Sequence, residues 1–290
     1  MTKLFTVLLF PLLFIVTDIH AQKYTFDSSS PVTVIQQVKN KDGKPYELTI
    51  TLPPDYQPEN GYKILYYLDA WWLKDLVPGC YRLKSLSNKS TENNLDELIL
   101  VGISSIGNDE DWNKQRNMDF TPSKSSLKLS IKQGNVELND KTTGGAEEFL
   151  RFLEDEVIKS VESKYKVNSS SRGILGHSFG GLFGFYAYLN SPGLFSNYIL
   201  ISPAIWWNQS ELLVNKEYLS KGKRVNMFIA VGTNEAKMLK DPITNFVDEV
   251  NQEKNTNINL QYKQYEGANH HSLLPQSIYD GIELLYTKSN

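Results

Sequence analysis

Apolar residues gather in short runs along the chain, and longer amphipathic segments separate the later runs. Runs of roughly four to eight apolar or β-branched residues between polar turns are typical of buried strands. Their alternation with helical periods predicts a mostly parallel sheet that carries helices on both faces. The predicted strands are 32–39, 46–52, 62–68, 95–103, 173–175, 198–201, 225–231 and 259–265.

The first two predicted strands form a hairpin, because Asp42-Gly43 between alternating runs is a strong turn signal. The clearest helix begins at 144–146, with acidic residues near its positive N-terminal end. Further helices are predicted at 182–189, at 210–219 with Ser210 as N-cap, at 239–252 and at 273–286. The apolar face of the helix after 144–146 is predicted to be Phe149, Leu150, Leu153, Val157, Val161 and Tyr165.

One long stretch, 105–143, is polar and shows little periodicity of either kind. A compact domain rarely carries a connection of this length without a use. A lid over an active site is predicted here, because functional residues often lie on such segments. A disordered insertion is the alternative.

Residues 1–21 do not belong to the predicted fold. Lys3 supplies a positive start, 4–16 is almost entirely apolar, and Ala21 ends the segment with a small side chain. This pattern is typical of a secretory signal peptide and is too short for a spanning helix with stop-transfer flanks. The mature domain would be 22–290, secreted or periplasmic and without a stable membrane span. An N-terminal membrane anchor is the alternative.

The composition narrows the class of partner. The chain has 290 residues, a formal net charge of −3 and 40% hydrophobic residues, which suits one large domain and gives no basic surface for nucleic acid. Its one cysteine, Cys80, cannot form an intrachain disulfide. The sequence has no H-E-x-x-H motif, no paired cysteine set and no Rossmann glycine motif, so neither a metal nor a cofactor is predicted.

The pentapeptide 176–180, Gly-His-Ser-Phe-Gly, matches the G-x-S-x-G pattern. An apolar run precedes it and a helical period follows it, which is the context of a nucleophile elbow. The glycines leave space at a sharp, strained turn. Ser178 Oγ would then stand at the carboxyl edge of the sheet, and the N–H of Phe179 would point to the same space as an oxyanion donor.

Serine needs a base to become a nucleophile. His270 and His271 follow the last predicted strand, so their loop falls at the same sheet edge as Ser178. One of this pair is therefore the predicted base. His177 adjoins Ser178, but adjacent side chains diverge on a sharp turn, so we expect it to pack or support instead.

The orienting acid should follow the penultimate strand. Glu235 does so directly, whereas Asp241 is better explained as a residue at a helix start. A dyad without a working acid stays open. The order serine, acid, histidine is that of the α/β hydrolases. In that fold the second oxyanion donor comes from the turn after strand 62–68, where the N–H groups of Ala70 and Trp71 are the candidates.

At these residues the chain resembles the putative-esterase branch of the α/β hydrolases, which includes enterobactin-type siderophore esterases and family-one carbohydrate esterases. The resemblance covers nearly all of the mature chain and implies an α/β-hydrolase fold. The segments that carry it are Leu68-Asp69, Arg116-x-x-Asp119-Phe120-x-Pro122, 144–146, 176–181, Ser202-Pro203-Ala204-Ile205-Trp206-Trp207 and 267–270.

The resemblance also implies roles for single residues. In the family the histidine directly after the asparagine is the base, which here is His270, and His271 stands where the family usually has glycine. Arg116 matches the arginine of pockets that bind anionic catecholates. Trp71, Trp206 and Trp207 are predicted to contact substrate, with stacking on sugars or aromatic acyl groups for the last two. Core packing is the alternative for Trp206 and Trp207.

The predicted function is a secreted serine carboxylic-ester hydrolase with a small-molecule or oligosaccharide ester as substrate. Siderophore trilactone cleavage and removal of acetyl or feruloyl groups from polysaccharide fragments both fit. An acyltransferase would use the same catalytic residues. A catalytically silent binding protein is a further alternative, against which the ordered set Ser178, Glu235 and His270 argues.

Overall fold

The computed structural model describes residues 31–54, 56–88, 95–126, 132–133, 135–220, 222–253 and 256–287. The predicted signal peptide, 1–21, lies outside these ranges. No helix within them is both long and apolar enough to span a bilayer.

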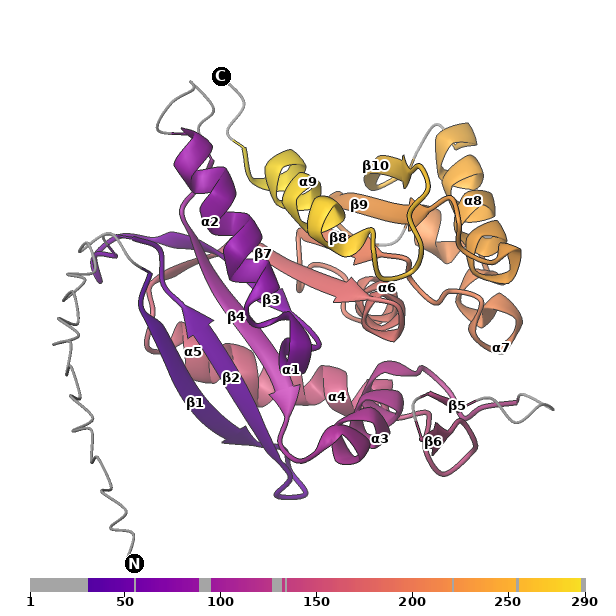
Figure 1. The fold of residues 1–290 in the computed structure, drawn as a ribbon, viewed down its shortest axis with the longest axis horizontal. Coiled ribbons are helices and arrows are strands. Elements are labelled where there is room, and N and C mark those ends of the chain that lie inside the picture. Colours follow the sequence, from indigo (N-terminus) through magenta and orange to yellow (C-terminus); the bar gives the residue numbers. More distant parts are fainter. Residues whose placement is uncertain are drawn as a thin grey trace, which may run out of the picture.

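A sheet of eight strands forms the centre of the molecule, in the order β1-β2-β4-β3-β7-β8-β9-β10 (Figure 1). β2 runs antiparallel to both neighbours, and every adjacent pair from β4 to β10 is parallel. The predicted mostly parallel sheet is therefore confirmed. The strands are β1 Thr33–Lys39, β2 Pro45–Thr51, β3 Tyr62–Tyr67, β4 Leu98–Ser105, β7 Val167–His177, β8 Asn197–Ile201, β9 Val225–Gly232 and β10 Ile258–Tyr265.

Helices cover both faces of this sheet (Figure 1). α2 and α9 pack side by side on one face. α4, α5, α6 and α8 contribute to the core on the other face. The helices are α1 Ala70–Leu73, α2 Leu76–Asn88, α3 Asp109–Phe120, α4 Ala146–Phe152, α5 Lys159–Glu162, α6 Phe179–Asn190, α7 Trp207–Ser210, α8 Lys237–Gln252 and α9 Leu274–Tyr286.

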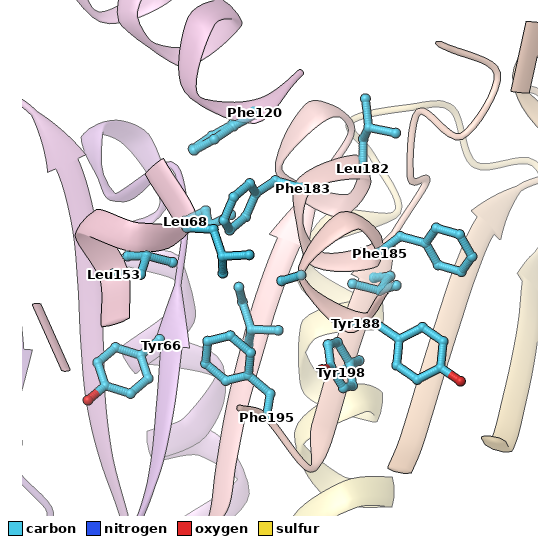
Figure 2. Close-up of a cluster of buried hydrophobic side chains, with 14 of the residues drawn as sticks. Tyr66, Leu68, Phe120, Leu153, Leu182, Phe183, Phe185, Tyr188, Phe195 and Tyr198 are labelled. Atoms are coloured by element: carbon cyan, nitrogen blue, oxygen red, sulfur yellow. The ribbon is translucent and has the colours of Figure 1, made fainter. Parts of the chain in front are cut away.

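α6 is apolar on almost every side, because it lies between the sheet and the surrounding helices. Figure 2 shows Phe183 of α6 directed toward Phe120 of α3, with Phe185 and Tyr188 on other sides of the helix. The ring of Phe183 also lies 4.9 Å from that of Phe149 on α4. The predicted apolar face of the helix that begins at 146 is confirmed from Phe149 to Val161, all of it buried. A π-helical turn, Leu153–Ile158, joins α4 to α5.

The stretch 105–143 contains a helix that the hydrophobic pattern did not predict. α3 begins with a capping box, in which the Asn108 side chain accepts from the N–H of Asp111 and the Asp111 side chain accepts from the N–H of Asn108. Three acids in its first turn suit the positive end of a helix. The hairpin of β5 Lys132–Gln133 and β6 Val136–Glu137 follows. Asn108-x-x-Asp111 was therefore the signal that could have revealed this helix.

The prediction of a helix at 210–219 is wrong. Ser210 has a left-handed φ of 59° and forms no side-chain cap bond. The segment instead contains the end of α7 and two short 3₁₀ turns, Glu211–Leu213 and Glu217–Leu219. 3₁₀ helices have poorer hydrogen-bond geometry and rarely extend beyond three or four residues, so this segment forms short turns and not one continuous helix.

Replacing Gly176 by alanine should destabilise the fold. The added Cβ would lie 2.2 Å from the carbonyl oxygen of Gly180, a backbone atom that cannot move alone. We expect the free energy of unfolding to fall by about 3 kcal/mol, measured by chemical denaturation. Gly79→Ala is the matched control, because its Cβ meets nothing within 4 Å on α2. It should stabilise the protein by up to about 1 kcal/mol. Equal stability of the two variants would contradict this packing.

Candidate active site

Ser178 stands at the turn between β7 and α6 in a strained conformation, with φ 57° and ψ −116°. Its N–H donates to the carbonyl of Ile201 at 2.9 Å. Its own carbonyl accepts from the N–H groups of Leu182 and Ala204. A left-handed φ at a residue other than glycine costs of order 1–3 kcal/mol and persists only when neighbours hold it. The predicted strand, turn and helix are therefore present around this serine.

The half-buried side chain of Ser178 lies at a cavity of about 570 Å³ at the carboxyl edge of the sheet. Of the residues predicted to act in a site, His270, Arg116 and Trp71 also line this cavity. Trp72 and Trp112, to which the sequence had given no role, line it as well. Trp112 comes from α3, so the stretch 105–143 supplies one wall of the cavity.

His270 is bound to the predicted acid. Its Nδ1 lies 2.7 Å from Glu235 Oε2, in a hydrogen bond that a proton on Nδ1 allows. The other oxygen, Oε1, accepts from Ser202 Oγ at 2.5 Å and from the N–H of Gly232 at 2.7 Å. Asp241, the competing acid, is exposed on α8 and is not part of the cavity wall.

The surroundings of Glu235 keep it ionised. Only 6% of the residue is exposed, and burial by itself would raise the pKa of the carboxyl. The hydrogen bonds from His270, Ser202 and Gly232 outweigh burial, so the pKa lies below its ordinary value. A carboxylate that stays charged can fix the imidazole with its proton on Nδ1, which leaves Nε2 as the free base.

The two predicted oxyanion donors are both first residues of helices. Phe179 begins α6, and Ala70 begins α1 directly after Asp69, which has a left-handed φ of 58°. Neither N–H donates to a protein acceptor within the described part of the chain. The two turns adjoin, since a Cβ on Gly180 would lie 3.5 Å from Leu68 Cβ. First-turn N–H groups of helices are suited to bind developing negative charge.

Arg116 is mostly engaged with protein groups, although it was predicted to bind substrate. Its Nε and Nη2 donate to the two carboxylate oxygens of Asp69 at 2.6 and 2.8 Å. Nη2 also donates to the carbonyl of His177 at 3.1 Å. The guanidinium lies over the rings of Phe120 and Phe179. Nη1 is buried and has no hydrogen-bond partner within the described residues.

Trp207 packs in the core and does not reach the cavity. It has no exposed surface, its ring lies edge-on 5.4 Å from Phe179, and its Nε1 donates to Ser123 Oγ. The prediction that it stacks on a substrate is therefore wrong, because the side chain is fully buried and is not part of the cavity wall. Trp206 is half-buried and is also absent from the cavity wall.

His271 and His177 surround the ring of His270, at 5.3 and 4.5 Å between ring centroids. His271 is exposed at the cavity, and its pKa is lowered by burial of the ring and by His270. Within the described residues its side chain bonds no carboxylate, so only His270 of the predicted pair is oriented by an acid. The described residues contain no cluster of three or more His, Cys, Asp or Glu suited to hold a metal ion.

The model of the putative esterase family matches residues 40–273. The chain belongs to the putative esterase family. As a member of this family with the sheet order described above, it is an ester hydrolase with an α/β-hydrolase fold.

Relatives of this esterase include proteins named for siderophores. The ferri-bacillibactin esterase BesA of Bacillus subtilis is 26% identical over 254 residues, which cover 84% of this chain and 86% of BesA. The apo-salmochelin esterase of Escherichia coli is 29% identical over 168 residues, 58% of this chain and 49% of that relative. The crystal structure of the BES protein of Bacillus cereus superposes with a TM-score of 0.77 at 26% identity, covering 88% of this chain and 96% of that one.

Removing Arg116 from this esterase should destabilise it strongly. Arg116→Met leaves the buried Asp69 carboxylate without its partner, and we expect a loss of about 3–5 kcal/mol in the free energy of unfolding. The double variant Asp69→Asn/Arg116→Met should be more stable than the single variant, because no uncompensated charge remains. Chemical denaturation at neutral pH measures both.

Lys159→Met is the control for this comparison. Lys159 pairs with Asp155 on an exposed helical surface. Its loss should leave the free energy of unfolding nearly unchanged, because solvent screens such an exposed pair. An Arg116→Met protein as stable as Lys159→Met would show that the buried pair contributes nothing to the fold.

Proposed function

We propose that the chain is a serine carboxylic-ester hydrolase in which Ser178 is the nucleophile, His270 the base and Glu235 the orienting acid. The observation that carries this proposal is the 2.7 Å bond from His270 Nδ1 to a buried carboxylate. His270 borders the same cavity as the strained Ser178. Sequence order, elbow and acid-bound imidazole together are typical of this class of hydrolase.

In the proposed mechanism, His270 Nε2 takes the proton of Ser178 Oγ while that oxygen attacks the ester carbonyl. The N–H groups of Phe179 and Ala70 stabilise the oxyanion of the tetrahedral intermediate. The intermediate collapses to an acyl-serine, and the alcohol leaves with the proton from His270. Water, deprotonated by His270, then attacks the acyl-serine and releases the acid and free Ser178. Glu235 stabilises the imidazolium in each half-reaction.

The residues that line the cavity favour an ester with an aromatic acyl group as substrate. Three of the five tryptophans, Trp71, Trp72 and Trp112, line it, and flat apolar rings favour flat aromatic ligands. We therefore place a siderophore trilactone with aromatic acyl groups first among substrates, in line with the names of the relatives. A feruloyl ester on a polysaccharide fragment fits the same walls and is the second candidate.

The domain organisation belongs to the same proposal. Residues 1–21 would direct export to the periplasm or exterior, where siderophore and polysaccharide esters are met. Residues 22–290 would form the hydrolase domain. Within it, 105–143 would act as the substrate-covering segment, since α3 already contributes Trp112 to the cavity wall.

A fluorophosphonate probe tests the nucleophile. It should label the wild-type protein once and should not label Ser178→Ala, because the probe forms its bond with the activated serine oxygen. Hydrolysis of an iron-free catecholate trilactone should be lost in the same variant, while its thermal unfolding midpoint stays near that of the wild type. Labelling that survives Ser178→Ala, or unchanged turnover, would refute the assignment. Methyl ferulate and acetylated xylan in the same assay separate the substrate classes.

The charge of the cavity predicts a preference for the iron-free trilactone. Among the described residues that line it, Arg116 is the one permanent cation and is paired with Asp69, while Asp109 adds a negative charge. The ferric complex is strongly anionic. A negative charge brought near Asp109 is repelled, although solvent and salt screen this exposed side chain. We expect kcat/KM for the ferric complex to be lower than for the iron-free trilactone, most clearly at low ionic strength.

Asp109→Asn is the matched variant for this preference. An asparagine oxygen can still accept from Trp71 Nε1, as Asp109 Oδ1 does at 3.1 Å. The variant should narrow the gap between the two forms without changing the rate on the iron-free ester. Equal or faster hydrolysis of the ferric complex by the wild type would contradict the charge argument.

A further inference from the structure

We propose that His177 is a positioning residue that holds the catalytic imidazole through the backbone of His270, by donating its Nε2–H to the His270 carbonyl. The proposal rests on the function proposed above, in which His270 is the base. The two atoms lie 2.7 Å apart. The nucleophile elbow therefore fixes the loop of the base as well as the serine.

His177 is itself firmly placed. It is the last residue of β7, it is only 2% exposed, and it pairs in register with Ile201 of β8. Its carbonyl accepts from Arg116, which is anchored on Asp69. A donor on a central strand with a tied backbone is a rigid point from which to hold a neighbouring loop.

The loop that carries His270 needs such a point. It joins β10 to α9, and its residues from Glu266 to Ser272 are exposed or half-buried. Its first part is tied to the turn after β9, where Thr233 Oγ1 accepts from the N–H of Gly267 and the N–H of Asn234 donates to the carbonyl of Ala268. Within the described part of the chain, the side chains of Glu235 and His177 are the two that form hydrogen bonds with His270: Glu235 binds its ring, and His177 binds its backbone carbonyl.

The chemistry of the bond determines the state of His177. A carbonyl oxygen can only accept, so Nε2 must carry the proton. Burial, together with His270 and Arg116, lowers the pKa of His177 well below its ordinary value, so the ring is neutral. Nδ1 is then an unprotonated acceptor, and it has no protein partner. An apolar ring at this position would leave no nitrogen unsatisfied. We therefore attribute the presence of a histidine here to its Nε2–H donor.

The ring also packs directly against the base. Its centroid lies 4.5 Å from that of His270 and 5.7 Å from that of Trp72. Substitutions must therefore separate the effect of the donor from the effect of the volume. Glutamine and methionine have side chains of similar length and shape, and only glutamine offers an N–H near the position of Nε2.

The experiment compares His177→Gln with His177→Met on the iron-free trilactone ester. A misplacement of a catalytic group by about 1 Å can cost about 100-fold in rate. We expect kcat of His177→Met to fall by about that factor with KM nearly unchanged, and kcat of His177→Gln to stay within about tenfold of the wild type. The rate of fluorophosphonate labelling should fall in parallel. Equal kcat values for the two variants, whether high or low, would overturn the proposal.

Two controls keep the result interpretable. Val161→Ala removes buried volume on α5, away from the cavity, and should lower the unfolding midpoint without lowering kcat. Ser178→Ala tests the proposed function independently. If this variant retains turnover, the hydrolase mechanism fails. If Ser178→Ala is inactive while His177→Met is fully active, only the role of His177 is rejected.

Nitrogen NMR of the wild-type imidazoles gives a test that needs no folded variant. His177 should appear as the neutral tautomer with its proton on Nε2, and that proton should exchange slowly with solvent because the ring is buried. A proton on Nδ1, or a doubly protonated ring at neutral pH, would rule out the bond to the His270 carbonyl.

Discussion

The buried ion pair between Arg116 and Asp69 connects three parts of the chain on which the site depends. Arg116 belongs to α3, Asp69 to the turn after β3, and the His177 carbonyl that Arg116 also binds to the nucleophile elbow. Only 4% of Arg116 and 1% of Asp69 are exposed. A pair removed from water contributes little net stability by itself, but the loss of one partner is costly. The geometry of the two turns that carry the proposed oxyanion donors therefore depends on this contact.

The strain at Ser178 requires a similarly firm support. A left-handed φ at a serine persists only if the rest of the fold specifies it, and here three backbone hydrogen bonds and the packing of α6 do so. Figure 2 shows how α6 fills the space beside the sheet with Phe183, Phe185 and Tyr188. Close-packed side chains of this kind cannot move singly, so the serine oxygen stays presented at the sheet edge.

The sequence predicted the sheet and the catalytic candidates because both depend on chain order. Parallel strands place their carboxyl ends at one edge, so residues that directly follow strands, such as Ser178 and Glu235, had to lie there. Trp207 was misjudged because sequence alone does not show whether an aromatic ring faces a cavity or a core. α3 was missed because its apolar face is weak and its beginning is set by side-chain capping. The clamp of Arg116 on Asp69 joins residues far apart in sequence, which no local pattern reveals.

The proposed catalytic and recognition groups come from different parts of the fold. Ser178, Glu235 and His270 are placed by the turns and the loop that follow strands of a rigid parallel sheet, whereas Trp71, Trp72 and Trp112 come from α1 and α3. Substitutions on those two helices can change the shape and charge of the cavity while the serine and its base stay in place. This separation gives a physical route by which related esterases, such as those named for a ferric and for an iron-free siderophore, can differ in the ester that they accept.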